Sequence, residues 1–470
     1  MKSFGTSKLF ISILLFFACH FNSYSQDYEI ESVLQADDTK SFVLLKSDRK
    51  DFGFGILNSA GVMEWQTDIH GETLGMAKFG KDAVVFYAES TGNFSPLKVI
   101  HAVLVALDSK KILQDKEIYT NPGKFIIEPD ILLAPGNNFS CLLIRTTAYN
   151  PGFRFGGNNS NKIKDTKALT MVSLANDLTP KITDVKSSAI ESEYMGARAG
   201  SNNDVYICSY TGEQVEIEDF GANGELKGKL ETEVKRKKNT LLLPELSYDS
   251  LQQNCVDLAL ICTNKQKDDL VQLLRFNFNN KKIDASEEVP LDKGYRSSLK
   301  VAGGEKGRYL KMLDALQPVQ IIETNEKIIL IKEIHATSYH DNTSTAQRMG
   351  SIISIYNKDL KLLGEIAIDK WAANNLVRFD AIAGHVKDDK LYIITNERDG
   401  MGFKAILYVI GINDASLINS KEIEEKKSGI NWLTMPGDIM WYNTTYLVPF
   451  TKAKASIHLN LETALVSESY

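Results

Sequence analysis

Long hydrophobic runs, proline and cysteine are all scarce in this 470-residue chain. After residue 26 no segment reaches 18 uncharged apolar residues, so the sequence predicts no transmembrane helix in the mature chain. Proline totals 11, and no Pro-, Gly- or Ser-rich stretch separates one domain from another. The net charge of −6 gives no positive excess, which argues against nucleic acid as a general partner.

The N-terminus has the pattern of an export signal. Lys2 and Lys8 supply positive charge, and residues 9–18 form an apolar run too short to span a bilayer. Small residues flank the tyrosine in Ser23–Ser25, which predicts cleavage before Gln26. The ending Ser-Tyr-Ser-Gln resembles export signals common in Bacteroidota.

Residues 1–25 are therefore predicted to be a signal peptide, and residues 26–470 a single mature domain. The protein is expected in the periplasm, on the outer-membrane surface or outside the cell. A lipoprotein acylated at Cys19 is an alternative, although the preceding residues 16–18 fit a lipobox poorly.

The mature chain contains four cysteines, all in apolar, strand-like runs: Cys141, Cys208, Cys255 and Cys262. No Cys-x-x-Cys pair occurs, so no metal site is indicated. Cys255 and Cys262 are seven residues apart, and on one strand they would point to opposite faces. An oxidising compartment would permit a disulfide, but the spacing assigns none.

One pattern recurs along the chain: an apolar strand, a polar turn of about four residues, and a more polar strand. The turns begin near Asn58, Asp108, Ala175, Gly221, Asn279, Asn357, Asn413 and Asn460. Their mean spacing is about 57 residues, which is typical of repeat folds built from supersecondary units.

Two further strand candidates precede each turn motif, and one of them is apolar on both faces. These apolar segments are residues 42–46, 83–88, 139–145, 204–209, 255–262, 327–334, 390–395 and 445–450. A strand that is apolar on both faces is buried on both faces. Four strands per unit at this spacing predict an all-β fold, a single β-propeller. The turns predict eight four-stranded blades, or seven if one hairpin is an addition; two β-sandwich domains are an alternative that lacks a linker.

The resemblance extends to the β-propeller superfamily and to no specific family. The WD dipeptide, the kelch double glycine and the aspartate box of sialidases are absent. Residues 56–65, ILNSAGVMEW, resemble the strand-turn-Gly-apolar-Trp unit of quinoprotein-like propellers. This unit occurs once, so no quinone or other cofactor is implied.

In propellers the connections between second and third strands, and between one blade and the next, lie on one face. Long connections of these kinds therefore indicate where a ligand binds. The first spans Thr146–Asp165 and holds the candidate ligand-binding residues Tyr149, Phe153, Arg154 and Phe155. Exposed aromatic side chains beside an arginine can stack a sugar or anchor a partner. Alternatively, they fold back as a small satellite cluster.

A second connection, His335–Gly350, contains the candidates Tyr339, His340 and Asp341. Imidazole and carboxylate groups suit zinc, but the spacing matches no metal motif, which favours surface histidines and no metal. A fourth connection, Asn396–Gly402, is predicted to be a tight hairpin, because a calcium loop needs more oxygen ligands.

A third connection, Asp292–Leu313, carries the basic candidates Arg296, Lys300 and Arg308. With the basic run 235–238 it could form a positive patch for an anionic polysaccharide or an acidic partner. The alternative is two solvated loops.

No catalytic motif emerges, neither a G-x-S-x-G elbow nor an H-E-x-x-H helix. The sequence therefore favours an exported, non-catalytic binding or scaffold protein of the cell envelope or exterior. Its expected partner is a polysaccharide or an envelope protein. Two alternatives stay open: a polysaccharide lyase or glycosidase with its site on the loop-rich face, and a quinoprotein-type redox protein.

Overall fold

The computed structural model describes residues 29–46, 51–90, 97–123, 126–147, 166–234, 241–263, 269–302, 310, 312–340, 343–374, 382–399, 402–423, 432–434, 436–453 and 461–470. All structural statements below concern these residues. The predicted signal peptide lies outside them.

The described strands follow one another in antiparallel sets. The first set comprises β1 (Glu29–Gln35), β2 (Lys40–Lys46), β3 (Asp51–Asn58) and β4 (Met63–His70). The second comprises β5 (Glu72–Phe79), β6 (Asp82–Ser90), β7 (Leu97–Ala106) and β8 (Lys111–Thr120). The third comprises β9 (Ile126–Ala134), β10 (Asn138–Thr147), β11 (Thr166–Leu174) and β12 (Pro180–Val185). One residue pair, Asn138 with Lys78, joins the second and third sets.

The fourth set comprises β13 (Glu193–Ala199), β14 (Val205–Tyr210), β15 (Gln214–Phe220) and β16 (Leu226–Glu233). The fifth comprises β17 (Leu241–Tyr248), β18 (Cys255–Thr263), β19 (Leu270–Asn277), β20 (Lys282–Ala285) and the short β21 (Val289–Pro290). The sixth comprises β23 (Leu316–Glu323), β24 (Lys327–His340), β25 (Thr343–Asn357) and β26 (Leu362–Asn374), with β22 (Lys300–Val301) at its outer edge.

The seventh set comprises β27 (Ala383–Lys387), β28 (Lys390–Asp399), β29 (Gly402–Gly411) and β30 (Ser416–Ile423). In the eighth, β31 (Trp432–Thr434) and β32 (Met440–Trp441) share one edge of β33 (Thr445–Ala453), and β34 (Leu461–Ser469) pairs with the other. The described helices are α2 (Lys293–Ser298) and the single-turn helices η1 (Pro135–Asn137), η2 (Ser188–Ile190), η3 (Leu313–Ala315) and η5 (Pro436–Asp438). None of them is long and apolar enough to span a membrane.

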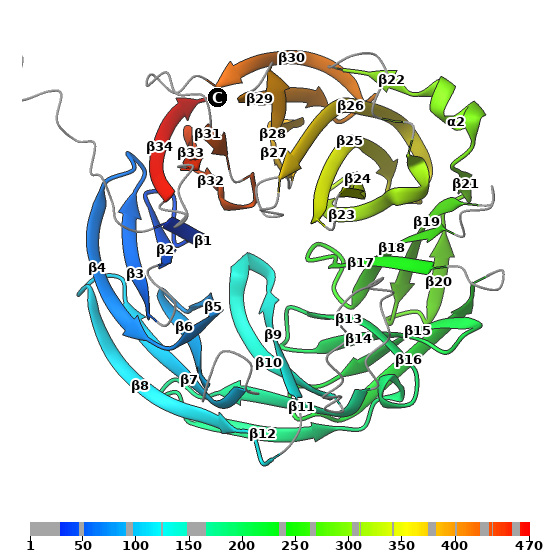
Figure 1. The fold of residues 1–470 in the computed structure, drawn as a ribbon. Coiled ribbons are helices and arrows are strands. Elements are labelled where there is room, and N and C mark those ends of the chain that lie inside the picture. The colour runs from blue at the N-terminus through cyan, green and yellow to red at the C-terminus, as the bar shows by residue number, and fades with distance from the viewer. Residues whose placement is uncertain are drawn as a thin grey trace, which may run out of the picture.

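The sets stand around a ring, with their first strands towards the centre and, at the perimeter, their fourth strands or, in the eighth set, β34 (Figure 1). First strands of neighbouring sets contact each other, as β9 does β13 and β13 does β17. The chain is therefore a single β-propeller, which confirms the predicted fold class. The ring closes where β1 meets β32 and β34, and among the described strands none is exchanged between the first and last sets. The number of blades stays a prediction.

The hairpin expected at Asn460 is wrong. The turn was predicted to join a third strand to a fourth. Leu461–Ser469 instead forms the strand β34, which pairs with the second strand of the set, β33, and so has the position of a third strand. Asn460 itself lies outside the described residues. An asparagine before an apolar run looks the same in the sequence whether the strand that follows is the third or the fourth.

Seven of the eight predicted apolar segments fall within the second strands of their sets, and the eighth, 204–209, begins one residue before β14. In β18, for example, every residue is buried. Buried side chains from neighbouring sets form common core clusters between the sheets; Phe54 of β3 packs in one cluster with Val85 of β6. Burial between two sheets explains why these strands lack the apolar–polar alternation of a half-exposed strand.

The turns between third and fourth strands share one backbone feature. In seven of them a residue near the end of the turn has a left-handed conformation: Gly61, Lys110, Leu178, Gly224, Lys281, Leu360 and Ala415. The turn is closed by a backbone hydrogen bond such as Gly61 N to Asn58 O at 2.9 Å. Only two of the seven residues are glycine, which is why the repeat is hard to see in the sequence.

Four described first strands contain an extra residue that breaks their register with the second strand. These bulges lie at Glu31, Leu74, Met195 and Val319. A bulge bends a strand and increases its twist. These four bulges lie in the strands nearest the centre of the ring.

Cys255 and Cys262 face opposite sides of β18, as their spacing predicts: Cys262 packs in one core cluster, whereas Ala259 and Ile261, on the side of Cys255, pack in another. All four described cysteines are buried, and no disulfide joins any two of them.

Candidate functional site

The candidate ligand-binding residues Tyr149, Phe153, Arg154 and Phe155 lie outside the described residues. Their connection does join the second strand of the third set, β10, to its third strand, β11. The basic run 235–238 also lies outside and connects β16 to β17. The first connection joins a second strand to a third, and the other joins one set to the next. Connections of these two kinds were expected on the ligand-binding face.

The loop expected over His335–Gly350 is wrong. Strands β24 and β25 continue through this segment, and Tyr339 and His340 pair with Ser344 and Thr343. Asp341 lies outside the described residues. The segment reads as a polar loop because it is rich in Thr and Ser, but threonine and tyrosine also have high strand propensity.

The segment Asp292–Leu313 is only partly a loop. Arg296 lies in the helix α2, which begins where the Asp292 carboxylate accepts a hydrogen bond from the Tyr295 amide at 2.8 Å. Lys300 lies in β22, which pairs in parallel with β26. Arg308 lies outside the described residues. The hairpin predicted at Asn396–Gly402 is confirmed, since Asp399 pairs with Gly402.

Two faces of the ring can now be distinguished. We call "loop face" the ends of the sheets where second strands connect to third strands and where one set leads to the next. We call "turn face" the opposite ends, which hold the seven left-handed turns. Three groups of charged side chains stand out, two towards the loop face and one on the turn face.

The first group lies between the third and fourth sets, near the loop face. We call Glu128, Asp130, Arg145 and Tyr194 the Arg145 cluster. Arg145, two residues before the end of β10, forms an ion pair with Glu128 of β9. Its guanidinium lies over the ring of Tyr194, 4.8 Å from the centroid. The Tyr194 hydroxyl donates to Asp130 at 3.0 Å. Strands β9, β10 and β13 therefore bring two carboxylates, an arginine and an aromatic ring together.

The Arg145 cluster is partly open to solvent. The Arg145 and Glu128 side chains are 21% and 22% exposed, and Asp130 is exposed. Burial of Tyr194 and the neighbouring Asp130 carboxylate raise the pKa of its hydroxyl well above the ordinary value. Tyr194 therefore stays a neutral hydrogen-bond donor at neutral pH.

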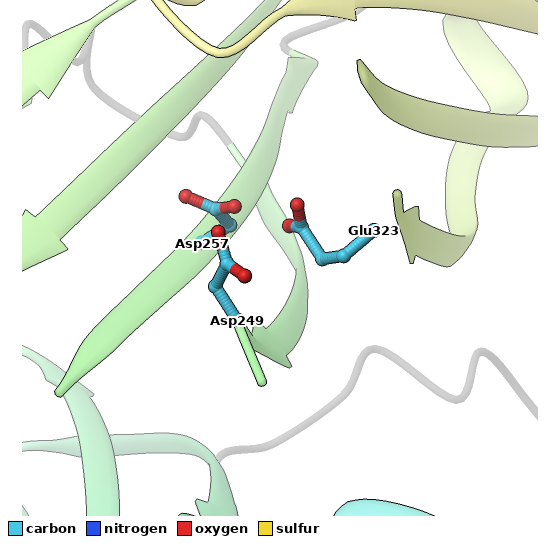
Figure 2. Close-up of side chains that lie close together, drawn as sticks. All are labelled: Asp249, Asp257 and Glu323. Carbon is cyan, nitrogen blue, oxygen red and sulfur yellow. The ribbon is translucent and has the colours of Figure 1, made fainter. Parts of the chain in front are cut away.

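The second group lies on the turn face between the fifth and sixth sets. We call Asp249, Asp257, Arg275, Glu323 and Lys358 the seam cluster. Asp257 and Arg275 are opposite each other on β18 and β19, and two hydrogen bonds of 2.8 and 2.7 Å join them. Figure 2 shows the three carboxylates approaching one another from two neighbouring sheets. Within the carboxylate trio, Asp249 and Asp257 are fully buried and the Glu323 side chain is 6% exposed.

The three carboxylates of the seam cluster are close enough to hold a metal ion, with one ligand atom of each within 4.8 Å of the others. Two cations of the protein already occupy this space, however. Arg275 takes both oxygens of Asp257, and Lys358 lies 3.1 Å from Asp249 and 2.7 Å from Glu323. The arrangement therefore fits an ionic clamp between sheets better than a metal site.

The third group lies in the sixth set on the loop-face side. We call Glu333, His335, Arg348 and Lys370 the Glu333 cluster. The Glu333 and Lys370 side chains are each 1% exposed, and Nζ lies 2.5 Å from Oε1. His335 Nε2 lies 2.8 Å from the other oxygen, Oε2. Burial alone would raise the pKa of Glu333, but Lys370 and His335 outweigh it and the pKa is lowered.

Sequence reasoning missed all three groups, although one signal was available. Arg145, Asp257 and Glu333, one from each group, lie inside the predicted segments 139–145, 255–262 and 327–334, which are largely apolar on both faces. A charge at such a position must find a partner, since an unpaired buried charge is very costly. The pattern can flag these residues, but it cannot say which strand supplies the partner.

Comparisons with known proteins identify no family for this chain. No family model matches the sequence, and no curated protein matches it. Among solved structures, the polysaccharide lyase Uly1 is similar over 85% of this chain and 89% of that chain, with a TM-score of 0.44 and 9% identity. The WD40 domain of SCAP from fission yeast is similar over 94% and 98%, with a TM-score of 0.42 and 8% identity. The endosialidase of phage phi92 is similar over 86% and 72%, with a TM-score of 0.36 and 8% identity.

Proposed function

We propose that this protein is an exported, non-catalytic binding protein that holds a polysaccharide on the loop face of its propeller. The observation that supports this most directly is the position of Arg145 over the ring of Tyr194. Flat aromatic rings stack on sugars, and arginine and carboxylate groups hydrogen-bond their hydroxyls. The cluster supplies all three kinds of group at one place.

The location of the Arg145 cluster supports the same function. Arg145 precedes the connection 148–165, which carries Tyr149, Phe153, Arg154 and Phe155. These four residues remain candidate ligand-binding residues, and the cluster would extend the surface that they offer. An envelope protein is the other partner class, since an arginine beside aromatic rings also anchors proteins. Export, through the predicted signal peptide, remains part of the proposal.

A binding screen on the mature protein, residues 26–470, tests the proposal. Purified protein is titrated with neutral and acidic glycans and with envelope extracts. We expect Tyr194→Ala and Arg145→Gln each to weaken glycan binding at least tenfold. Lys227→Gln is the control, because it also removes one positive charge but on the turn face, where Lys227 pairs with Asp204 at 2.5 Å. Glycan binding that survives both loop-face variants unchanged would contradict the proposal.

A second function, glycoside cleavage at the same cluster, has one observation in its favour. Glu128 and Asp130 are two residues apart on β9, so their side chains leave the same face of the strand from Cα atoms about 6.6 Å apart. Glycosidases place their two carboxyl groups about 5 to 9.5 Å apart. Product analysis on every glycan that binds decides between the two functions. Turnover that Asp130→Asn abolishes would make the protein an enzyme, whereas binding without product supports the binding protein.

A further inference from the structure

The sixth set departs from the other sets in the length of its strands. Strands β24, β25 and β26 have 14, 15 and 13 residues, whereas no other described strand exceeds 10. Beyond Gly350 the pairing of β25 shifts against both of its neighbours. Gly350 has a φ of 44°, a left-handed conformation that glycine adopts without strain. Bulges of this kind occur next to functional sites, where they redirect side chains.

The Glu333 cluster lies at this bulge. Glu333 precedes the register shift in β24, and His335 and Arg348 form the second residue pair beyond it. The charge of Glu333 is balanced by Lys370, whose ammonium lies 2.5 Å from Oε1. Oxygen Oε2 accepts from His335 at 2.8 Å. Both oxygens of the carboxylate are therefore engaged before Arg348 is considered.

Arg348 is left with a charge that no carboxylate neutralises at hydrogen-bonding distance in the part of the chain that the structure describes. Its nearest ion-pair contact joins Nε to Glu333 Oε2 at 3.8 Å, beyond a hydrogen bond. The Arg348 side chain is 14% exposed, and that of His335 is 19% exposed. A guanidinium presents its nitrogens as a planar fork that matches two oxygens of a carboxylate or sulfate. An Arg348 held for Glu333 alone would be expected closer to it.

We propose that Arg348 and His335 form a binding site for an oxyanionic group, a sulfate or a carboxylate, on the loop face at the base of the β24–β25 hairpin. Glu333 and Lys370 hold the site in position. Glu333 fixes the orientation of the His335 ring through Nε2, and Lys370 keeps Glu333 ionised. In an acidic polysaccharide the group would be a sulfate ester or a uronate. The site does not depend on glycan binding at the Arg145 cluster, because the two groups of residues belong to different sets.

The test uses two small probes, sodium sulfate and sodium glucuronate, titrated calorimetrically into the mature protein at low ionic strength. Glucose is the neutral control ligand. We expect both anions to bind and glucose not to bind at this site. Arg348→Gln should weaken anion binding at least tenfold. Arg348→Lys keeps the charge but not the fork, and should weaken it by a smaller factor. His335→Gln should also weaken binding.

Lys404→Gln is the matched charge control. Lys404 lies in β29, 3.8 Å from Glu422, and its removal should leave anion binding unchanged. A purely structural Arg348 would give variants with a lower unfolding midpoint but wild-type anion affinity, and that result would overturn the proposal. If Arg348→Gln does not fold, the lysine variant decides the question. Wild-type protein that binds neither anion would also overturn it, whereas failure of glycan binding at Tyr194 would contradict only the proposed function.

Discussion

Lys358, in the turn between β25 and β26, donates a hydrogen bond to Asp249 Oδ2 at 3.1 Å across the boundary between the fifth and sixth sets. The same ammonium lies 2.7 Å from Glu323, and the backbone oxygen of Lys358 accepts from Arg275 at 3.1 Å. One turn residue thus contacts both sheets of the seam cluster. In a propeller, neighbouring sheets are joined mainly by apolar packing, so this ionic contact is an additional and specific connection.

Replacing Lys358 with methionine is expected to destabilise the protein by about 3 kcal/mol, because the buried carboxylate of Asp249 loses an ion-pair partner at a place where the lysine side chain is only 18% exposed. Urea unfolding, followed by tryptophan fluorescence, measures the change. Lys282→Met is the control: its pair with Asp284 is largely exposed, and its loss should cost less than about 1 kcal/mol. Equal effects of the two substitutions would show that the seam cluster adds nothing to stability.

Glu323→Gln should change how stability depends on pH. The pKa of Glu323 is raised from 4.5 to about 10. Burial is the largest cause, and the hydrogen bond with Asp257 and the negative charge of Asp257 add to it. The folded protein therefore binds a proton that the unfolded chain releases. The contribution of Glu323 to the free energy of unfolding is complete below pH 4.5 and decreases as the pH rises from 4.5 to 10. The decrease is at most about 1.4 kcal/mol per pH unit.

The glutamine variant lacks this titration, so the difference in unfolding free energy between it and the wild type should grow in favour of the variant from pH 5 to pH 9. Urea unfolding at pH 5, 7 and 9 measures it, and groups that titrate in both proteins cancel. A difference that stays constant over this range would mean that Glu323 is ionised throughout.

Gly350→Ala should destabilise the sixth set. The new Cβ would lie 2.6 Å from Leu310 Cδ2 and 3.3 Å from Ile334 Cδ1, at a φ of 44°. Strain of this kind costs about 1 to 3 kcal/mol. Gly123→Ala is the control, because a Cβ there meets nothing within 4 Å. We expect a lower unfolding midpoint and weaker sulfate binding for the first variant only.

The thiols of the folded mature protein should react slowly with an aromatic disulfide reagent. All four are buried, and burial raises the pKa of Cys141 to about 12 and that of Cys255 to about 11. Thiolate is the reactive form, so labelling requires local or global unfolding. Reaction of four thiols in urea, but of few in native buffer, is the expected result. Fast native labelling would contradict the buried placement of these residues.

Deleting residues 150–160 is expected to leave folding intact and to weaken glycan binding. In the sequence the segment lies between the end of β10 and the start of β11. Circular dichroism and urea unfolding measure the fold, and the glycan titration measures binding. Loss of cooperative unfolding would instead assign this segment to the core.

The sequence was most informative where one strand carries its own signal. Segments such as 255–262 are apolar on both faces, and this pattern placed the second strand of every set. It was misleading at His335–Gly350, where a Thr- and Ser-rich stretch pairs as strand, and at Asn460, where a turn-like residue precedes a third strand. In both cases the local composition suits two structures, and the pairing partner decides between them.

The sequence by itself determined the all-β class, the repeat, the order of strands and the opposite facing of Cys255 and Cys262, because each follows from periodicity along one segment. Only the tertiary structure decided which charges meet. Arg145 contacts Tyr194, and Lys358 contacts Asp249, although the two residues of each pair are 49 and 109 positions apart in the sequence. Such contacts depend on how neighbouring sheets pack around the ring, and no pattern within a single strand specifies that packing.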